Sequence, residues 1–209
     1  MRAECSHKEN VTIPASDAVR VFNAIELPSD VREELGQVAN RLRTRCSGDQ
    51  LKWVAVTGIH LTLKFLGEIP VSRLEAVRGA TATSSAGVGE LTLELGSLGA
   101  FPSSSRPRVV WVGLEGDVPK LVSLAERLDR GLQAIGFERE SRPFSPHLTL
   151  ARVRPDASPQ AQTEIGLAVI RVRPPDRLRF TATEVSLMQS QLKPEGPLYT
   201  RLARWPLSS

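Results

Sequence analysis

The tetrapeptide HLTL occurs twice in this chain, at residues 60–63 and again at 147–150. Only three histidines are present in 209 residues, and two of them open the two copies. Each copy follows a similar succession of apolar patterns, a β-rich run and then an amphipathic helix, at a similar distance. The repeat therefore predicts a duplicated chain, in which each half delivers a histidine at the start of a strand.

The two halves show the same order of predicted elements. Alternating apolar residues indicate strands, whereas apolar residues spaced by three and four indicate helices. The first half is expected to contain a strand at 18–27, a helix at 30–44, the first HLTL, a helix at 70–82, a loop at 81–90 and a strand at 91–101. The second is expected to contain a strand at 108–114, a helix from 117 to 135 capped by Gly136, the second HLTL, a helix at 160–170, and strands at 178–190 and 198–207.

This order of elements predicts an α+β fold of two similar lobes, related by a pseudo-twofold axis around a central cleft. Each lobe should hold a mostly antiparallel sheet with helices on one face. Residues 1–17 are a polar leader that we expect to be disordered, and residues 18–209 are expected to form one bilobal catalytic domain.

Composition limits the class of protein further. No apolar run approaches the length of about 18 residues that would indicate a membrane span, and the leader has no apolar core typical of a signal peptide. The two cysteines, Cys5 and Cys46, form neither a disulfide framework nor a zinc-binding spacing. We therefore expect a cytoplasmic protein with no membrane partner. Its net charge of +4 suits a phosphate-bearing ligand.

The repeated strand places a histidine and a threonine on one face. Side chains alternate along a strand, so His60 and Thr62 point one way and the two leucines point the other, toward the core. The same holds for His147 and Thr149. If the two His–Thr faces meet in a shared cleft, one imidazole can take a proton from an attacking oxygen while the other protonates a leaving oxygen. The threonine hydroxyls can donate hydrogen bonds to phosphate oxygens.

These histidines could also have a structural or a metal-binding role. A single histidine in a strand most often has a structural role, but two copies of one motif at matching places argue against that reading. A metal site is disfavoured because no Asp, Glu or Cys stands at ligand spacing beside either histidine. His7 in the leader is expected to be a solvated bystander. Ser145 has no acid partner placed to suggest a hydrolase triad.

At these two motifs the sequence resembles the 2H phosphoesterase superfamily, and within it the RNA 2′,3′-cyclic phosphodiesterases, also called 2′-5′ RNA ligases. The resemblance spans residues 19–207 and is carried by VFNAIELP, WVAVTGIHLTLKFLGEIP, RPFSPHLTLARVR and YTRLARWPL. It implies a duplicated bilobal fold and an enzyme without metal or other cofactor. Its substrate would be RNA with a 2′,3′-cyclic phosphate end and its product a 2′-phosphate, with reversible 2′-5′ RNA ligation as an additional reaction.

The resemblance also implies roles for individual residues. His60 would be the proton donor to the departing 3′ oxygen, and His147 the proton acceptor acting on water. Thr62 and Thr149 would bind the non-bridging oxygens. Arg152 matches an arginine that follows the second motif and suits phosphate binding, but on a regular strand it would point away from His147 and reach the site only through a twist or bulge.

Three further residues near the motifs carry expectations of their own. Phe65 stands at the Arg152 offset in the first motif, where core packing is expected and stacking on a terminal base is the alternative. Lys64 shares the His60 face by strand parity, and Arg142 lies in a proline-flanked loop. Both could meet phosphate, or they could simply be solvated.

Two alternative functions remain open on the sequence. One is hydrolysis of a small cyclic-phosphate nucleotide or of 2′-5′ oligoadenylate, and the other is a non-catalytic module that binds RNA ends. A paired acid and base would be unnecessary in a pure binder, which favours an enzyme. A two-lobed cleft needs no partner subunit, so we expect a monomer.

Overall fold

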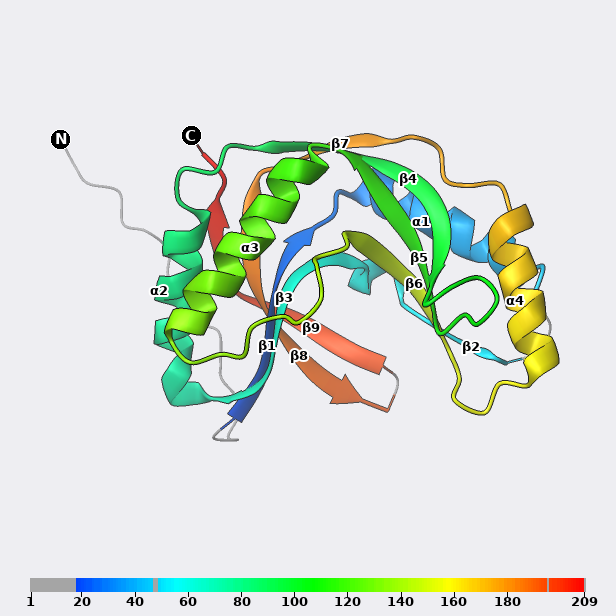
Figure 1. Ribbon diagram of the computed structural model, residues 1–209, viewed down its shortest axis with the longest axis horizontal. Helices are drawn as coiled ribbons and strands as arrows, with labels where there is room; N and C mark the ends of the chain where they lie inside the picture. The colour runs from blue at the N-terminus through cyan, green and yellow to red at the C-terminus, as the bar shows by residue number, and fades with distance from the viewer. Residues whose placement is uncertain (1–17, 47–48, 195, 209) are drawn as a thin grey trace.

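The computed structural model describes residues 18–46, 49–194 and 196–208, which form two antiparallel sheets with helices packed against them (Figure 1). The expected α+β class with two antiparallel sheets is confirmed. The polar leader lies outside the described residues. The strands are β1 (Ala18–Glu26), β2 (Leu51–Trp53), β3 (His60–Pro70), β4 (Leu91–Phe101), β5 (Val109–Gly116), β6 (His147–Val153), β7 (Arg179–Ala182), β8 (Glu184–Lys193) and β9 (Gly196–Pro206).

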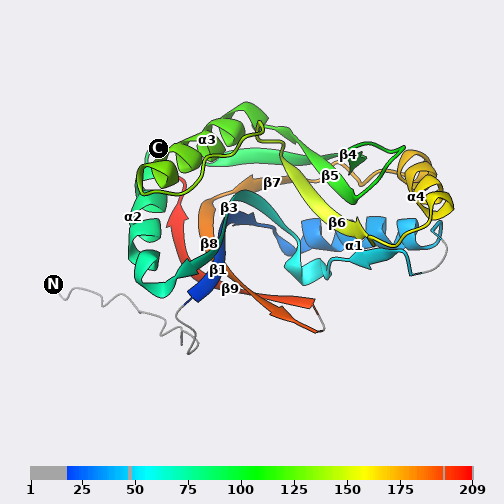
Figure 2. The ribbon, with the colours of Figure 1, turned by 60° about the horizontal axis from the view of Figure 1, so that its bottom comes forward.

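The helices follow the predicted order. They are α1 (Ser29–Arg43), α2 (Leu74–Ser85), α3 (Val118–Ala134) and α4 (Pro159–Arg171), with short 3-10 turns η1 (Val56–Gly58) and η2 (Val71–Arg73). In both views α2 and α3 lie beside the four-stranded sheet, and α1 and α4 lie beside the five-stranded sheet (Figure 1, Figure 2). Gly136 ends α3 with a φ of 90°, as its predicted capping role requires. None of the described helices is long and apolar enough to cross a membrane.

The two sheets exchange strands between the halves of the chain. The strand order is β3-β1-β8-β9 in the four-stranded sheet and β2-β6-β5-β4-β7 in the five-stranded sheet. The triples β3-β1-β8 and β6-β5-β4 therefore match, and in each triple the third strand comes from the opposite half. Each half of the chain thus supplies an inner strand to the sheet that contains the motif strand of the other half.

This exchange corrects one prediction. The run 178–190 is predicted as a single strand, but it breaks at Thr183. The first piece, β7, pairs with β4 at the edge of the five-stranded sheet, and the second piece, β8, pairs with β1 in the other sheet. The apolar residues stand at even positions up to Ala182 and then at the odd positions of Val185 and Leu187, so the alternation shifts by one residue where the chain changes sheet.

The predicted loop at 81–90 is also partly wrong, because α2 continues to Ser85. Three of its polar residues, Thr81, Ser84 and Ser85, face the protein interior. Asn23 Nδ2 donates to Thr81 Oγ1 at 3.0 Å, and Ser84 Oγ donates to the carbonyl of Arg127 at 3.2 Å, whereas the Ser85 hydroxyl is buried without a partner. A Cβ on Gly131 of α3 would come within 2.3 Å of Ser84 Oγ, so this glycine lets α2 and α3 approach closely. The small polar residues thus serve helix packing.

The core lies between the sheets and their helices. The leucines of both HLTL copies, Leu61, Leu63, Leu148 and Leu150, are all buried in the main apolar cluster, as predicted from alternation. A second, small cluster of Phe22, Ala24 and Met188, with Tyr199 packed against it, lies apart from the main core. The opposite faces of the two motif strands are therefore available for a site.

Candidate active site

The two motif strands approach each other although they belong to different sheets. Residues of β3 and β6 come within 8 Å between Cα atoms. His60 opens β3 and His147 opens β6, and both side chains are half-buried. The fold therefore brings the two motif strands near each other, and the meeting of the two histidines across one phosphate stays a prediction.

Each histidine is held by the same backbone contact. His60 Nδ1 lies 2.8 Å from the carbonyl oxygen of Gly58, and His147 Nδ1 lies 2.8 Å from that of Ser145. A carbonyl oxygen only accepts hydrogen bonds, so in both rings Nδ1 carries the hydrogen and donates it. Nε2 is then the nitrogen left to exchange a proton. Both imidazoles are thus prepared for acid–base chemistry through the same atom.

Aromatic rings fix the orientation of each imidazole. The His60 ring stacks on Phe22, with centroids 4.6 Å apart, and meets the edge of Tyr199 at 4.9 Å. The His147 ring meets Phe101 edge-on at 5.0 Å, and Phe101 in turn packs on Trp111 at 4.9 Å. Sequence reasoning missed these supports, because they come from strands distant in sequence and no motif marks them.

A β-bulge follows the threonine of the first motif. Residues opposite one another in an antiparallel pair project from the same face. Glu26 faces His60 and Ala24 faces Thr62, but Asn23 faces Lys64, so Leu63 is an extra residue on β3. Beyond the bulge, the alternation of side chains along β3 is reversed.

The reversal corrects two predictions. Lys64 does not share the His60 face and is neither solvated nor free to attract phosphate; it is 4% exposed and binds Asp129 of α3 at 2.8 Å. Phe65 is not core, since it is 43% exposed and projects with Phe22 from the His60 face. Strand parity failed at both positions because of the bulge.

The second motif carries a bulge at the matching place. Trp111 faces Thr149 and Val110 faces Ala151, which leaves Leu150 as the extra residue on β6. Arg152 then stands opposite Val109, on the face of Thr149 and His147. The condition set for Arg152 to reach the site is therefore met. In both repeats the bulged residue is the last leucine of HLTL.

Tyr199 connects the two motifs. Besides contacting His60, it lies near enough to Arg152 and Arg20 for both positive charges to oppose the burial that raises the pKa of its hydroxyl. A Cβ on Gly58 would come within 3.1 Å of the Tyr199 ring, so a side chain at the residue whose carbonyl holds His60 would press on this ring. Tyr199 thus contacts His60 of the first motif and lies within the electrostatic influence of Arg152 of the second.

The environment of His60 affects its protonation. Burial lowers the pKa of His60, while its hydrogen bond to Gly58 and the negative charge of Glu26 act in the opposite direction. Without a ligand the ring therefore favours the neutral form. A bound phosphate anion would counter this effect, since nearby negative charge favours imidazolium.

The other residues for which the sequence predicts a role lie as follows. Thr62 and Thr149 are half-buried on the faces of their own histidines. Arg142 is exposed in the loop before β6, and its contact with RNA stays a prediction. His7 lies outside the described residues. Within the described ranges, no three His, Cys, Asp or Glu side chains cluster in a way that could hold a metal ion.

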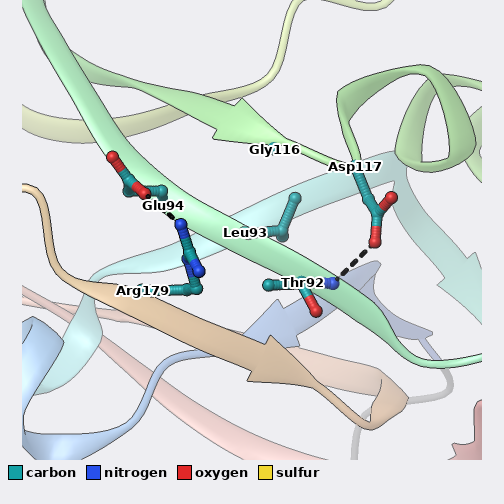
Figure 3. A pocket seen from close by; sticks show the side chains of 6 residues that line it. All are labelled: Thr92, Leu93, Glu94, Gly116, Asp117 and Arg179. Carbon is teal, nitrogen blue, oxygen red and sulfur yellow. Dashed lines mark hydrogen bonds and ion pairs between the residues drawn. The ribbon is translucent and has the colours of Figure 1, made fainter.

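A depression of about 200 Å³ lies elsewhere, at the outer edge of the five-stranded sheet (Figure 3). Its charged groups are already paired: Arg179 binds Glu94 at 3.3 Å, and Asp117 accepts from the Thr92 backbone at 2.9 Å. The latter hydrogen bond is the main cause of a lowered Asp117 pKa. The depression contains no residue of either motif, so we do not regard it as the active site.

Comparison with known proteins gives consistent matches along most of the chain. The family model described as LigT like phosphoesterase matches twice, over residues 25–111 and 112–199, in agreement with the duplication. An RNA 2′,3′-cyclic phosphodiesterase of Methanocaldococcus jannaschii is 28% identical, over 90% of this chain and 100% of the relative. One of Escherichia coli K12 is 31% identical, over 92% and 99%. The crystal structure of E. coli LigT complexed with 3′-AMP superposes with a TM-score of 0.73 at 28% identity, covering 92% and 99%.

Proposed function

The chain belongs to the LigT-like phosphoesterase family, and from this premise we propose that it opens 2′,3′-cyclic phosphates at RNA ends to give 2′-phosphomonoesters. The observation that carries the proposal is the matched pair of imidazoles. Each donates from Nδ1 to the carbonyl two residues earlier and keeps Nε2 free, and they stand on two strands that approach each other.

The proposed reaction uses one proton donor and one proton acceptor. His147 Nε2 takes a proton from water as the water oxygen attacks phosphorus. His60, as imidazolium, gives its Nε2 proton to the 3′ oxygen as the phosphorus–O3′ bond breaks. One water is consumed, and the product carries a 2′-phosphate and a 3′ hydroxyl. Such acid–base assistance typically contributes about 10²–10⁴ in rate.

Three further side chains stabilise the charge that develops on phosphate. The hydroxyls of Thr62 and Thr149 donate to the non-bridging oxygens, one from each strand. Arg152 adds a charge-assisted contact, which its place on the His147 face allows. An anionic phosphate in this position also restores the protonated form of His60 that the donor role needs. The same groups could serve 2′-5′ ligation if a 5′ hydroxyl replaced water: His147 would take the hydroxyl proton as its oxygen attacks phosphorus, His60 would protonate the departing 3′ oxygen, and a 2′-5′ phosphodiester would form.

The proposal keeps two expectations from the sequence, a cytoplasmic location and a monomeric state, the second of which size-exclusion chromatography tests. It also keeps catalysis without a metal ion. Hydrolysis of small cyclic-phosphate nucleotides or of 2′-5′ oligoadenylate is the alternative activity, and a non-catalytic RNA-end binder is the alternative class.

Identification of the product tests the proposal. Purified protein is incubated with an oligonucleotide ending in a 2′,3′-cyclic phosphate, with and without EDTA, and the monoester is assigned by ³¹P NMR. We expect a 2′-phosphate at the same rate in both samples. A 3′-phosphate, or loss of activity in EDTA, would contradict the mechanism, and absence of turnover would favour the binding module.

A further inference from the structure

Phe65 is an exposed aromatic residue on the same face of the four-stranded sheet as His60. The bulge at Leu63 turns it out of the core, and 43% of its surface remains accessible. Its partner across the strand pair is Phe22, whose ring stacks on His60. Phe22 therefore connects His60, on which its ring stacks, with Phe65, which it faces across the strand pair.

Arg20 adds a positive charge beside this ring. Its guanidinium carbon lies 4.7 Å from the centre of the Phe65 ring, in a cation–π arrangement. Arg20 stands two residues before Phe22 on β1, and so projects from the same face. Its charge also acts on Tyr199, which contacts His60. The aromatic and the cation are thus continuous with the candidate active site.

A depression of about 340 Å³ lies beside Arg20, where β1, β3 and β8 run side by side. Its lining includes side chains from both faces of the sheet, and Glu68, Ser190 and Leu192 belong to the Arg20 face. The Leu192 side chain at its margin is 72% exposed.

We propose that Phe65, Arg20 and this depression bind the RNA strand on the 5′ side of the cyclic phosphate, so that the enzyme prefers an oligonucleotide to a mononucleotide. Phe65 stacks on an upstream base, and Arg20 neutralises an upstream phosphate. This inference rests on the proposed function, and it adds the part of the substrate that the two motifs do not touch.

The chemistry of the face fits single-stranded RNA. Bases that are not paired expose flat faces, which stack on aromatic side chains regardless of sequence, and the backbone between them favours cationic neighbours. Phe65 offers the aromatic ring and Arg20 offers the positive charge, and the two lie side by side. Glu68, the acidic side chain among the lining residues, stands opposite Arg20 on β3 and leaves the Phe65 side of Arg20 as the place for a phosphate.

Kinetics on two substrates test the inference. The substrates are adenosine 2′,3′-cyclic phosphate and a hexanucleotide with the same end, and kcat/KM is measured for the unaltered protein, Phe65→Ala and Arg20→Ala. The matched control is Ile170→Ala, because Ile170 on α4 is also apolar and 68% exposed but lies beside the other sheet. We expect Phe65→Ala to lower the hexanucleotide value by about tenfold, the order expected for one lost base stack, and the mononucleotide value by much less.

Salt dependence gives an independent readout for Arg20. If Arg20 neutralises one phosphate of a single strand, Arg20→Ala should reduce the slope of log kcat/KM against log salt by about 0.7 for the hexanucleotide. A purely structural role of Arg20 would leave that slope unchanged.

The outcomes separate the inference from the function on which it rests. Equal losses on both substrates, no loss on either, or no preference of the unaltered protein for the hexanucleotide would overturn the RNA track while leaving the phosphodiesterase intact. Failure of the unaltered protein to hydrolyse both substrates would instead contradict the proposed function itself.

Discussion

Lys64 Nζ lies 2.8 Å from Asp129 Oδ1, and this buried ion pair joins the first motif strand to helix α3 of the second half. Lys64 also donates to the carbonyl of Glu138 at 2.8 Å and contacts Glu140 at 3.3 Å. Both residues belong to the loop that leads to His147. Burial alone would raise the pKa of Asp129, but hydrogen bonds from Lys64 and from the Glu140 backbone outweigh it and hold that pKa below its usual value.

Removal of one partner of this pair should destabilise the protein. Lys64→Met leaves Asp129 buried without its main partner, which we expect to lower the free energy of unfolding by about 3 kcal/mol. The double variant Lys64→Met/Asp129→Leu should recover most of the loss, because no buried charge is then left unpaired; Glu140 and Arg139 also lose a partner, but both are exposed. Urea denaturation measures both, with Lys120→Met as the control, since Lys120 pairs with Asp117 at an exposed site. A single variant as stable as the unaltered protein would rule out this role.

As pH rises, kcat/KM should begin to fall at a comparatively low pH. This constant reports groups of the free enzyme, in which burial holds the pKa of His60 below its ordinary value of 6.5. His60 must be protonated to act as donor, so kcat/KM should fall as pH rises through that lowered pKa. The fall in kcat should begin at a higher pH than the fall in kcat/KM, because bound phosphate raises the pKa of His60. An increase of kcat/KM from pH 7 to pH 9 would be incompatible with this assignment.

Phe22→Leu should alter His60 without touching the substrate. Phe22 is 3% exposed and stacks on the imidazole, so a smaller side chain admits water to the ring. We expect a stability loss of about 1–2 kcal/mol and a rise in the pKa of His60 toward its ordinary value. Titration of the histidine resonances by NMR measures the shift, and an unchanged pKa would show that Phe22 does not desolvate His60.

Gly99→Ala should impair the support of His147. A Cβ at Gly99 would come within 2.3 Å of the Trp111 ring, which packs on Phe101 beside the imidazole. The displaced ring should cost about 1–3 kcal/mol of stability and lower kcat more than it raises KM. Gly79→Ala is the matched control: it lies within α2, has no atom within 4 Å of an added Cβ, and should stabilise the fold by up to about 1 kcal/mol. Equal kcat values for the two variants would refute the support role.

Much of this architecture follows from local pattern. Alternation placed the HLTL leucines in the core and the histidines on the opposite face, and helical spacing found α1, α3 and α4. The duplication was visible because a short motif recurred among rare residues. These features depend on neighbours in sequence, and periodicity reports such features directly.

Most of the errors share a physical cause, because they depend on pairing between distant strands; the loop predicted at 81–90 instead failed because polar residues of α2 are buried. The bulges at Leu63 and Leu150 are defined only against β1 and β5, and they decide that Lys64 is buried and that Arg152 reaches the His147 face. The break at Thr183 exists because β7 and β8 join different sheets. Tyr199 reaches His60 only through the fold. The bulges and the Tyr199 contact have no local signal in a single sequence, whereas the break at Thr183 coincides with a one-residue shift in the apolar alternation.

The catalytic claim is tested most directly by single-turnover hydrolysis of an oligonucleotide with a 2′,3′-cyclic phosphate end by His60→Ala, His147→Ala and the double variant. His7→Ala supplies the control, and circular dichroism verifies that each variant is folded. We expect each single variant to lose at least about 10²-fold in rate, and the double variant to lose little more, because the two imidazoles act as a unit. Turnover near that of the unaltered protein by either single variant would contradict the account.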